Sequence, residues 1–499
     1  MRYNKLIKFI SFLISFLFIL ISTVNGYEII SLDHDPLVDV EITIDIIQIR
    51  SLEKDDIQIP TTERIDIFGS PDFYVKLIIN GEEFTSQTWE NLKYIYNPEF
   101  SITVNVPDDE ENVDIKIQLW DKNKDGDKLC DISPFGYDLP DDYEVELVYN
   151  IKTGHWWGDD YCDDNPTYSD PSGYGRLNGC DDGSIYQLDR DCEIIFDIYQ
   201  NDFDNDGIPY WTEVEVYGSD PTIADLGDPD GDGVSVYWEY KWGHIFGWRN
   251  SIWIYNPFEY DDHVNIDVDE DGLNNIEEYL MSQWGADPFR RDVFVELDVM
   301  ECNPEGDLTC FPEGSLELLN TAFNRQNVVI HIDDGLMGGS DIIPFDEETT
   351  GDELDNIYWQ YFYQNDENNT RVGIFHYGVM VYNAKGASGF IFRPDAFQIS
   401  LYGMQEKLNQ FPWLKYDIVF ASAYMHELGH TFAFNPLPGH NEGCYYPWQI
   451  GWWLVRPYKS CMNYAYMYYT VDYSDGSHGK NDFDDWERMD MTYFQRYWE

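Results

Sequence analysis

The pentapeptide His426-Glu427-Leu428-Gly429-His430 constrains this chain more than any other part of its sequence. Histidines four positions apart lie one turn apart on the same face of a helix, where both imidazoles can bind one metal ion. Glu427, beside the first histidine, can take a proton from a metal-bound water. The chain has only ten histidines in 499 residues, so few chance pairs at this spacing are expected. The pentapeptide therefore predicts a helix that carries two ligands and a general base.

The residues around this motif predict a buried helix. Residues 418–434 are apolar nearly all round, and histidines in a core need partners because unpaired buried polar groups are costly. A histidine pair bonded to backbone carbonyls would satisfy that need without a metal. Zinc is the favoured alternative because it binds imidazole and requires no redox control outside the cell.

A second motif follows downstream, where Met462 and Tyr464 stand in the sequence Ser-Cys-Met-Asn-Tyr. It resembles the methionine turn of metzincins, in which a methionine packs beneath the metal and a tyrosine follows two places later. Together with the His-Ile-Asp-Asp-Gly sequence at 331–335, residues 291–499 resemble a pappalysin-like zinc metalloprotease of the metzincin type. The resemblance implies a mixed sheet with helices, Glu427 as general base and Tyr464 as a stabiliser of the oxyanion.

The sequence departs from the metzincin pattern at the third zinc ligand. That family continues the helix as H-x-x-G-x-x-H, but Ala433 and Pro436 occupy the glycine and third histidine positions here. We expect His440 to complete the site by way of a longer loop, so the predicted zinc ligands are His426, His430 and His440. Alternative third ligands are Glu442, Asp472 and His478. Without any third ligand the domain would be an inactive relative.

Three twelve-residue acidic loops predict calcium sites. Each has acids at positions 1, 3, 5 and 12 and a glycine at position 6, which together supply the oxygen ligands and the sharp turn that calcium requires. Solvated acidic turns are the structural alternative. The predicted calcium ligands are Asp202, Asp204, Asp206, Glu213, Asp228, Asp230, Asp232, Glu239, Asp267, Asp269, Asp271 and Glu278.

The segments around these loops distinguish them from ordinary EF-hands. Residues 192–197 alternate like a strand, and the breaks at 218–221 and 285–288 shorten the helices that follow. The repeats resemble thrombospondin type 3 calcium repeats, with dockerin modules as the second choice. We expect a calcium-binding spacer over residues 201–290 with little apolar core, so that the metal supplies much of its folding energy.

The N-terminal region, residues 27–200, alternates apolar and polar residues at period two. Predicted strands at 38–46, 73–79, 100–106 and 113–120 favour an antiparallel β-sandwich. The sequences at 70–76, 97–100 and 119–121 resemble the calcium-dependent phospholipid-binding sandwich first described in protein kinase C. The resemblance implies loop aspartates and a possible lipid contact, and an adhesion-type sandwich is the alternative. Aspartates near those loops are Asp72, Asp121, Asp125 and Asp127.

The N-terminal residues and the cysteine content of the chain indicate secretion. Residues 1–26 have a basic start, an apolar stretch and small residues for cleavage, as in a signal peptide, although an uncleaved membrane anchor is an alternative. Eight cysteines then suggest four disulfides, with Cys302–Cys310 and Cys444–Cys461 as local pairs. Asn368 begins a glycosylation sequon. The net charge of -64 excludes nucleic acid as a partner.

These observations predict a multidomain chain whose C-terminal α+β domain, residues 291–499, hydrolyses peptide bonds. We expect a secreted, extracellular zinc metalloendopeptidase with calcium-stabilised N-terminal modules and a protein or peptide substrate. One alternative is a calcium-binding adhesion or matrix protein with a catalytically inactive protease-like domain. Another is a gluzincin-type peptidase whose third ligand is a glutamate such as Glu487, against which the Met-Asn-Tyr sequence argues.

Overall fold

The computed structural model describes residues 40–53, 65, 69–107, 110–134, 143–160, 175–183, 190–246, 252–306, 311–434 and 437–497. The predicted signal peptide, Cys162, Cys310 and Pro436 lie outside these residues. Along the described residues, no helix has both the length and the apolar character that a bilayer span requires.

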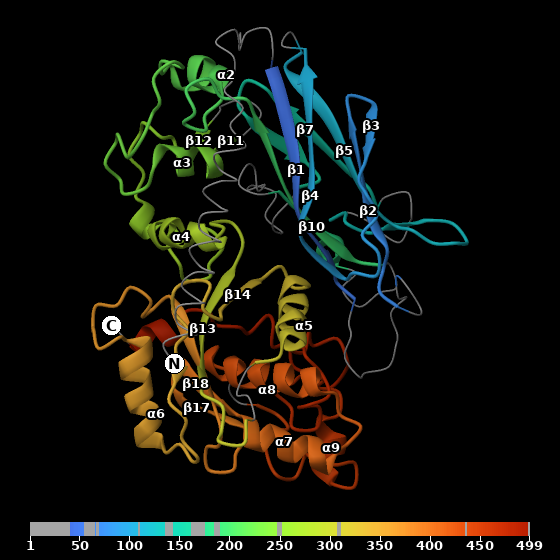
Figure 1. Ribbon diagram of the computed structural model, residues 1–499, viewed down its shortest axis with the longest axis vertical. Helices are drawn as coiled ribbons and strands as arrows, with labels where there is room; N and C mark the ends of the chain where they lie inside the picture. The colour runs from blue at the N-terminus through green and yellow to red at the C-terminus, as the bar shows by residue number, and fades with distance from the viewer. Residues whose placement is uncertain are drawn as a thin grey trace.

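The N-terminal region forms two antiparallel sheets that face each other (Figure 1). One sheet has the order β4-β1-β10-β9, and the other has the order β3-β2-β5-β7-β8 with β6 paired to β5. The strands are β1 (Val40–Ser51), β2 (Phe73–Ile79), β3 (Glu82–Thr85), β4 (Tyr94–Val106), β5 (Asn112–Asp121), β6 (Lys128–Cys130), β7 (Val145–Asn150), β8 (His155–Gly158), β9 (Gly175–Asn178) and β10 (Cys192–Gln200).

Alternating apolar residues form the core between these sheets. Ile42, Ile44 and Ile46 of β1 are buried and share one hydrophobic cluster with Val75 and Leu77 of β2. Side chains at period two point to one face of a strand, so this face of β1 is directed at the opposite sheet. The predicted antiparallel sandwich and its four predicted strands are confirmed.

The middle region contains short elements joined by the three acidic loops, shown in green in Figure 1. Its largest apolar cluster is small and includes Trp238, Trp242, Tyr255 and Phe289. The elements are α2 (Tyr210–Thr212), α3 (Val236–Trp242), β11 (His244–Phe246), β12 (Ile252–Ile254) and α4 (Asn275–Met281).

The C-terminal region is built on a mixed sheet of order β14-β13-β16-β18-β17, with β15 beside β13. The first four strands of this order are parallel, whereas β17 pairs antiparallel with β18 at one edge. The strands are β13 (Asp292–Met300), β14 (Val329–Asp333), β15 (Ile342–Ile343), β16 (Phe375–Val381), β17 (Gly389–Arg393) and β18 (Ala396–Ser400). The helices are α5 (Glu313–Asn324), α6 (Gly351–Ile357), α7 (Leu401–Gln410), α8 (Tyr416–Thr431) and α9 (Ile450–Val455).

Helices cover both faces of this sheet. Val293 and Val295 of β13 share a buried cluster with residues of α5 and α8. The intervening Phe294 belongs to a second cluster on the opposite face, with Leu354 of α6. Helix α8, which carries the two histidines of the pentapeptide, is therefore packed against the sheet along its length, as its apolar sequence predicts.

The sequence predicted the end of one strand in this region incorrectly. The sequence at 397–401 predicts a strand, but β18 ends at Ser400 and α7 begins at Leu401. The Ser400 side chain accepts a hydrogen bond from the backbone N–H of Gly403 and so caps the new helix. Strand β17 was also not predicted, although it forms the edge of the sheet beside the candidate site.

Candidate metal centre

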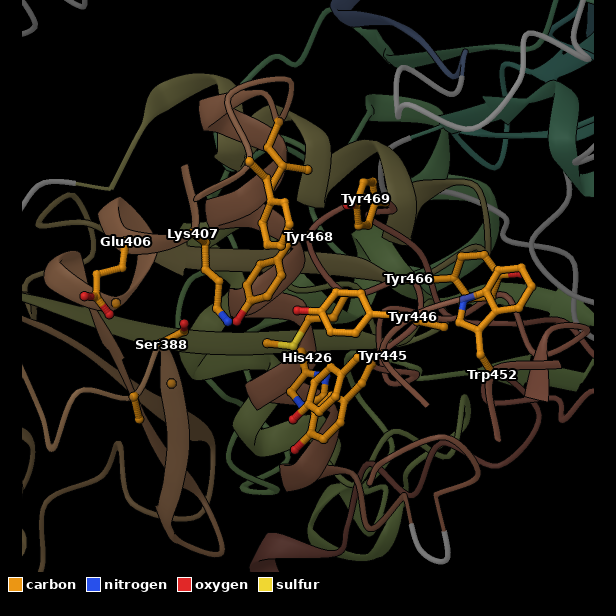
Figure 2. A pocket seen from close by; sticks show the side chains of 18 of the residues that line it. Ser388, Glu406, Lys407, His426, Tyr445, Tyr446, Trp452, Tyr466, Tyr468 and Tyr469 are labelled. Atoms are coloured by element: carbon orange, nitrogen blue, oxygen red, sulfur yellow. The ribbon is translucent and has the colours of Figure 1, made fainter. Parts of the chain in front are cut away.

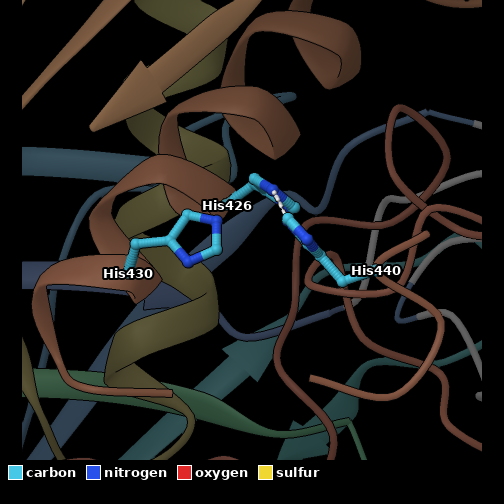
Figure 3. A group of neighbouring side chains, drawn as sticks. All are labelled: His426, His430 and His440. Carbon is cyan, nitrogen blue, oxygen red and sulfur yellow. Dashed lines mark hydrogen bonds between the residues drawn. The ribbon is translucent and has the colours of Figure 1, made fainter. Parts of the chain in front are cut away.

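Helix α8 places His426 and His430 one turn apart on a buried face (Figure 3). Their ring centroids lie 4.9 Å apart, and the two rings are nearly perpendicular. The third imidazole, His440, approaches from the loop after the helix and lies 4.9 Å from His430 between centroids. The three side chains form one group whose nitrogen atoms could hold a metal ion.

The spacing within this group fits tetrahedral zinc. Nε2 of His440 lies 3.2 Å from Nε2 of His426. Two nitrogens at about 2.0–2.1 Å from a tetrahedral zinc ion lie about 3.3 Å apart. The loop thus brings His440 to the place where a third ligand is needed, although the fourteen-residue separation from His426 differs from the metzincin pattern.

Backbone contacts fix the orientation of the first histidine. Nδ1 of His426 lies 2.8 Å from the carbonyl oxygen of Cys461, so this nitrogen carries the proton and Nε2 keeps its lone pair. The next residue, Met462, packs beneath the helix, because a Cβ atom on Gly429 would meet its sulfur. The tyrosine two places on, Tyr464, lies over His440 with 4.2 Å between ring centroids.

The three imidazoles are neutral over a wide pH range. Burial, followed by the charge of His430, lowers the pKa of His426 well below 6.5. Burial lowers the pKa of His430 to about 4 and also lowers that of His440. Neutral imidazoles have the lone pairs that bind a metal without competition from protons. The donor set therefore fits zinc in identity, spacing and protonation state.

Glu427 faces a cavity beside the histidines. Its carboxylate lies against Gly389 of β17, where an added Cβ atom would come within 2.6 Å of Oε1. Glu427 is 4% exposed, and burial raises its pKa to about 8. The cavity has a volume of about 780 Å³, and its wall includes His426, Glu427 and Tyr464. Other tyrosines, among them Tyr445 and Tyr468, crowd the same space (Figure 2).

The other candidate third ligands lie elsewhere. Asp472 bonds Arg325 and Trp486, and His478 bonds Asp482. Glu442 and Glu487 are exposed. In the described residues, the group around His426 and His430 is completed by His440 alone among the candidates considered from the sequence.

The three acidic loops have the same local geometry. In each, the first aspartate accepts a hydrogen bond from the position-six glycine N–H, at 2.7 Å for Asp202, 3.0 Å for Asp228 and 3.1 Å for Asp267. Those glycines have φ of 96°, 108° and 96°, a left-handed conformation that favours glycine. Loop geometry of this kind directs carboxylates inward, as calcium coordination requires.

The glutamate at position twelve is buried in every loop. Glu213 and Glu239 are 0% exposed and Glu278 is 1% exposed. Burial, followed by neighbouring aspartates, raises the pKa of Glu213 to about 8, and burial raises that of Glu239 to about 7. Both Glu278 oxygens are without a hydrogen-bond partner among the described residues. A divalent cation would relieve these costs.

Each loop makes a further contact that the sequence did not predict. The position-five aspartate accepts a hydrogen bond from the backbone N–H of a later aspartate: Asp225 for loop one, Asp261 for loop two and Asp292 for loop three. The separations are 19, 29 and 21 residues. Because this spacing is irregular, no fixed period in the sequence shows it. Asp292 opens β13, so loop three contacts the C-terminal sheet.

The sandwich aspartates gather at one end of the N-terminal domain. Asp72 and Asp121 are joined because the Asp72 N–H donates to Asp121 Oδ1 at 2.9 Å. The Tyr74 hydroxyl donates to Asp127 Oδ2 at 2.9 Å. Asp125 is exposed in the same loop. The structure thus brings together Asp72 and Asp121, while Asp127 is held by Tyr74.

The predicted pairing of Cys444 with Cys461 is wrong. The Cys444 thiol donates to Asn441 Oδ1 at 3.4 Å, whereas Cys461 lies in the hydrophobic core under α8. The described cysteines, Cys130, Cys180, Cys192, Cys302, Cys444 and Cys461, contain no disulfide. Sequence proximity suggested the pair, but the two side chains belong to different environments.

Comparison with known proteins identifies the N-terminal sandwich. Residues 40–132 match the family model described as C2 domain, so this sandwich is a C2 domain and the predicted resemblance is confirmed there. No curated protein matches the chain.

Several solved structures also resemble this chain. They include human GIVD cytosolic phospholipase A2 (12% identity, 33% of this chain, 17% of that chain, TM-score 0.19). A structure of two C2 domains of Extended-Synaptotagmin 2 matches at 11% identity over 34% of this chain and 44% of that chain, with a TM-score of 0.20. A structure titled as a C2 domain matches at 11% identity over 32% of this chain and 98% of that chain, with a TM-score of 0.19. The chain thus spans 17% of the phospholipase chain.

Proposed function

We propose that this protein is a zinc-dependent endopeptidase whose zinc ligands are His426, His430 and His440. The observation that carries the proposal is the 3.2 Å separation of the His426 and His440 Nε2 atoms beside a cavity that contains Glu427. A buried histidine pair bonded only to backbone would not need a third imidazole at this distance. Neutral imidazoles around one point are the donor set of catalytic zinc sites.

The side chains around the histidines support a hydrolytic role. Bound zinc supplies a Lewis acid that polarises a substrate carbonyl and makes water more acidic. Glu427 is the general base, because its carboxylate faces the cavity beside the histidines and can accept a proton from water and pass it to the leaving amine. The Tyr464 hydroxyl, with a pKa raised to about 12 by burial, stays protonated and can donate to the oxyanion.

Strand β17 offers a place for the substrate backbone. It is the antiparallel edge strand of the C-terminal sheet, and Gly389 at its start lines the cavity beside Glu427. An extended peptide can add to such an edge through backbone hydrogen bonds, as in β-augmentation. A substrate bound there would place a peptide bond next to Glu427. We therefore propose that protein or peptide substrates bind along β17.

The N-terminal modules have a separate proposed role. The C2 sandwich presents Asp72, Asp121 and Asp127 at one end, and the acidic loops bury Glu213 and Glu278. We propose that calcium occupies these sites, stabilises the modules and allows the sandwich to contact lipid. The signal-peptide-like sequence at residues 1–26 supports an extracellular location for the protein. Calcium is abundant outside the cell. Limited proteolysis tests the loops: calcium removal should expose residues 202–290 to cleavage, and unchanged sensitivity would contradict calcium binding there.

Zinc content and casein cleavage together test the enzymatic proposal. The full-length protein should hold a tightly bound zinc ion at the α8 histidines and cleave casein in calcium buffer. Glu427→Gln should retain the zinc and abolish cleavage, because it removes the base and no metal ligand. Protein that holds no zinc and cleaves nothing would contradict the proposal and favour a calcium-binding adhesion or matrix protein with an inactive protease-like domain.

A further inference from the structure

His263 lies beside the second acidic loop with its imidazole directed at two carboxylates of that loop. Its Nε2 atom is 3.2 Å from Oδ2 of Asp232 and 3.7 Å from Oε1 of Glu239. Asp232 lies in the acidic loop, Glu239 lies in α3, and His263 begins a later 3-10 turn. They form one group of potential metal ligands in which every member is buried.

Three polar atoms of this group are without a hydrogen-bond partner among the described residues. Nε2 of His263 and both carboxylate oxygens of Glu239 have no hydrogen bond among the described residues. His263 and Glu239 are each 0% exposed. Buried polar atoms without partners are costly, and a charged carboxylate is the most costly of them. Nε2 lies within ion-pair distance of Asp232 and Glu239 but outside hydrogen-bond geometry, so the three side chains converge on a common space.

Neighbouring side chains hold the imidazole in this orientation. Nδ1 of His263 lies 2.9 Å from the side-chain nitrogen Nδ2 of Asn275. The rings of Trp238 and Tyr255 pack on it with centroid distances of 5.7 Å and 5.2 Å. Rotation of the Asn275 amide by 180° exchanges this nitrogen for Oδ1, and Nδ1 then carries the proton while Nε2 has a free lone pair. This is the arrangement of a histidine that ligates a metal.

The other two acidic loops lack an equivalent imidazole. In each loop the position-five aspartate is bonded by the N–H of Asp225, Asp261 or Asp292. Two residues further on, the chain has Gly227 in loop one and Phe294 in loop three, but His263 in loop two. Neither glycine nor phenylalanine offers a metal ligand. Loop two is therefore chemically distinct, although its twelve-residue sequence matches the others.

We propose that the second acidic loop binds a divalent transition-metal ion through Asp232, Glu239 and Nε2 of His263. Calcium takes oxygen ligands, whereas imidazole nitrogen favours first-row transition metals such as Mn²⁺ and Zn²⁺. The carboxylates of the loop suit Mn²⁺ as well, so mixed nitrogen and oxygen donors select against calcium at this loop. The site is independent of the histidine group on α8 and of any peptidase activity.

Pulsed electron paramagnetic resonance of Mn²⁺ tests this site in the full-length protein. The protein is stripped of metal, given one equivalent of Zn²⁺ to fill the α8 histidines, and then given one equivalent of Mn²⁺ in millimolar calcium. Wild-type protein should show the nitrogen-14 modulation of a directly bound imidazole. His263→Gln should lose that modulation and release Mn²⁺ to calcium at least about tenfold more readily, as expected when a metal ligand is removed.

Two matched variants locate the signal. His331→Gln changes another histidine next to an acidic loop, whose Nε2 lies 2.7 Å from Asp292, and it should keep the modulation. His440→Gln alters the α8 group and should also keep it. A nitrogen signal that survives His263→Gln, or one lost in His440→Gln, would overturn the proposal.

Wild-type protein provides a test that does not depend on the folding of any variant. Mn²⁺ should stay bound against an excess of calcium on the order of a hundredfold. Release of Mn²⁺ by equimolar calcium, or the absence of nitrogen modulation in wild-type protein, would identify loop two as an ordinary calcium loop and overturn the proposal.

Discussion

The Nε2 atoms of His426 and His440 lie 3.2 Å apart, although the two residues stand on a helix and on the loop that follows it. This separation equals the edge of a tetrahedral zinc site within about 0.1–0.2 Å. It supports His440 as the proposed third ligand in place of the residue at 436. The loop after α8 therefore decides whether the centre can bind zinc.

His440→Ala should lower zinc affinity by at least about a hundredfold, because loss of a direct ligand costs at least as much as loss of an outer-shell partner. Competition with a fluorescent chelator measures this change. His478→Ala is the control, since His478 lies in the same C-terminal segment but bonds Asp482. Unchanged zinc affinity in His440→Ala would remove His440 from the site.

Gly389→Ala should lower kcat for peptide cleavage while zinc content stays equal to that of the wild-type protein. An added Cβ atom would come within 2.6 Å of Glu427 Oε1 and displace that carboxylate. The carboxylate is the end of a flexible side chain, so the fold should tolerate the change. Gly351→Ala is the comparison, because Gly351 lies outside the cavity and an added Cβ atom there comes no closer than 3.9 Å to another atom. Equal activity in the two variants would contradict the placement of Glu427.

The sequence predicted the parts of this site that lie on one element. The pentapeptide placed His426, Glu427 and His430 because a helix fixes side chains at known intervals. His440 was chosen among several alternatives, since the path of a loop does not follow from local preferences. Gly389 and the Cys461 carbonyl could not be found, because they meet the helix only through the tertiary packing of β17 and of the segment after α9.

The same distinction holds in the rest of the chain. Alternation of apolar residues predicted β1, β2 and β5 of the sandwich, and the twelve-residue pattern of acids and glycine predicted the acidic loops. Asp261 and His263 were missed, because their approach to loop two depends on the chain between residues 240 and 263. The disulfide pairing failed for a related reason: spacing along the chain says little about which buried thiols face each other.

Ala433→Gly should stabilise the C-terminal domain by about 0.5–1 kcal/mol. Ala433 has φ of 62° just after α8, a left-handed conformation that costs a residue with a Cβ atom energy and costs glycine little. Thermal unfolding of the zinc-loaded protein measures the gain. Ala421→Gly, inside the same helix, should instead destabilise by about 1 kcal/mol or more. A lower Tm for Ala433→Gly would contradict the strained backbone.

Asp395→Asn should stabilise the protein above pH 6 and have little effect near pH 4. Asp395 is 0% exposed, and burial raises its pKa to about 6 from 3.8, even though the Tyr358 hydroxyl donates to it at 2.6 Å. A raised carboxyl pKa favours the neutral form in the fold, so its stabilisation is full below 3.8 and lost as pH rises through about 6.

Asparagine keeps an acceptor for Tyr358 without the charge, so the gain at pH 8 can reach about 3 kcal/mol. Urea unfolding at pH 4.5 and pH 8 measures it. Asp355→Asn, on an exposed pair with Arg393, is the control and should change stability little at either pH. A pH-independent effect of Asp395→Asn would contradict the raised pKa.

Glu193→Gln should uncouple the C2 sandwich from the C-terminal domain. Glu193 on β10 is 0% exposed and accepts from Arg176 at 2.9 Å and from Arg290 at 3.2 Å. Its other oxygen accepts from the Asn324 side chain at the end of α5, at 2.9 Å. Neutralising this carboxylate leaves two buried guanidinium groups without its charge, which should cost about 3–5 kcal/mol.

Calorimetry of the full chain distinguishes this coupling from general loss of stability. The variant should show a lower and broader first transition and increased hydrogen exchange at the β10 and α5 contact, while the core of the C-terminal sheet keeps its protection. Glu111→Gln, which alters an exposed pair with Lys152 in the same sandwich, should leave both measurements nearly unchanged. If Glu193→Gln behaves like Glu111→Gln, the buried network does not hold the domains together.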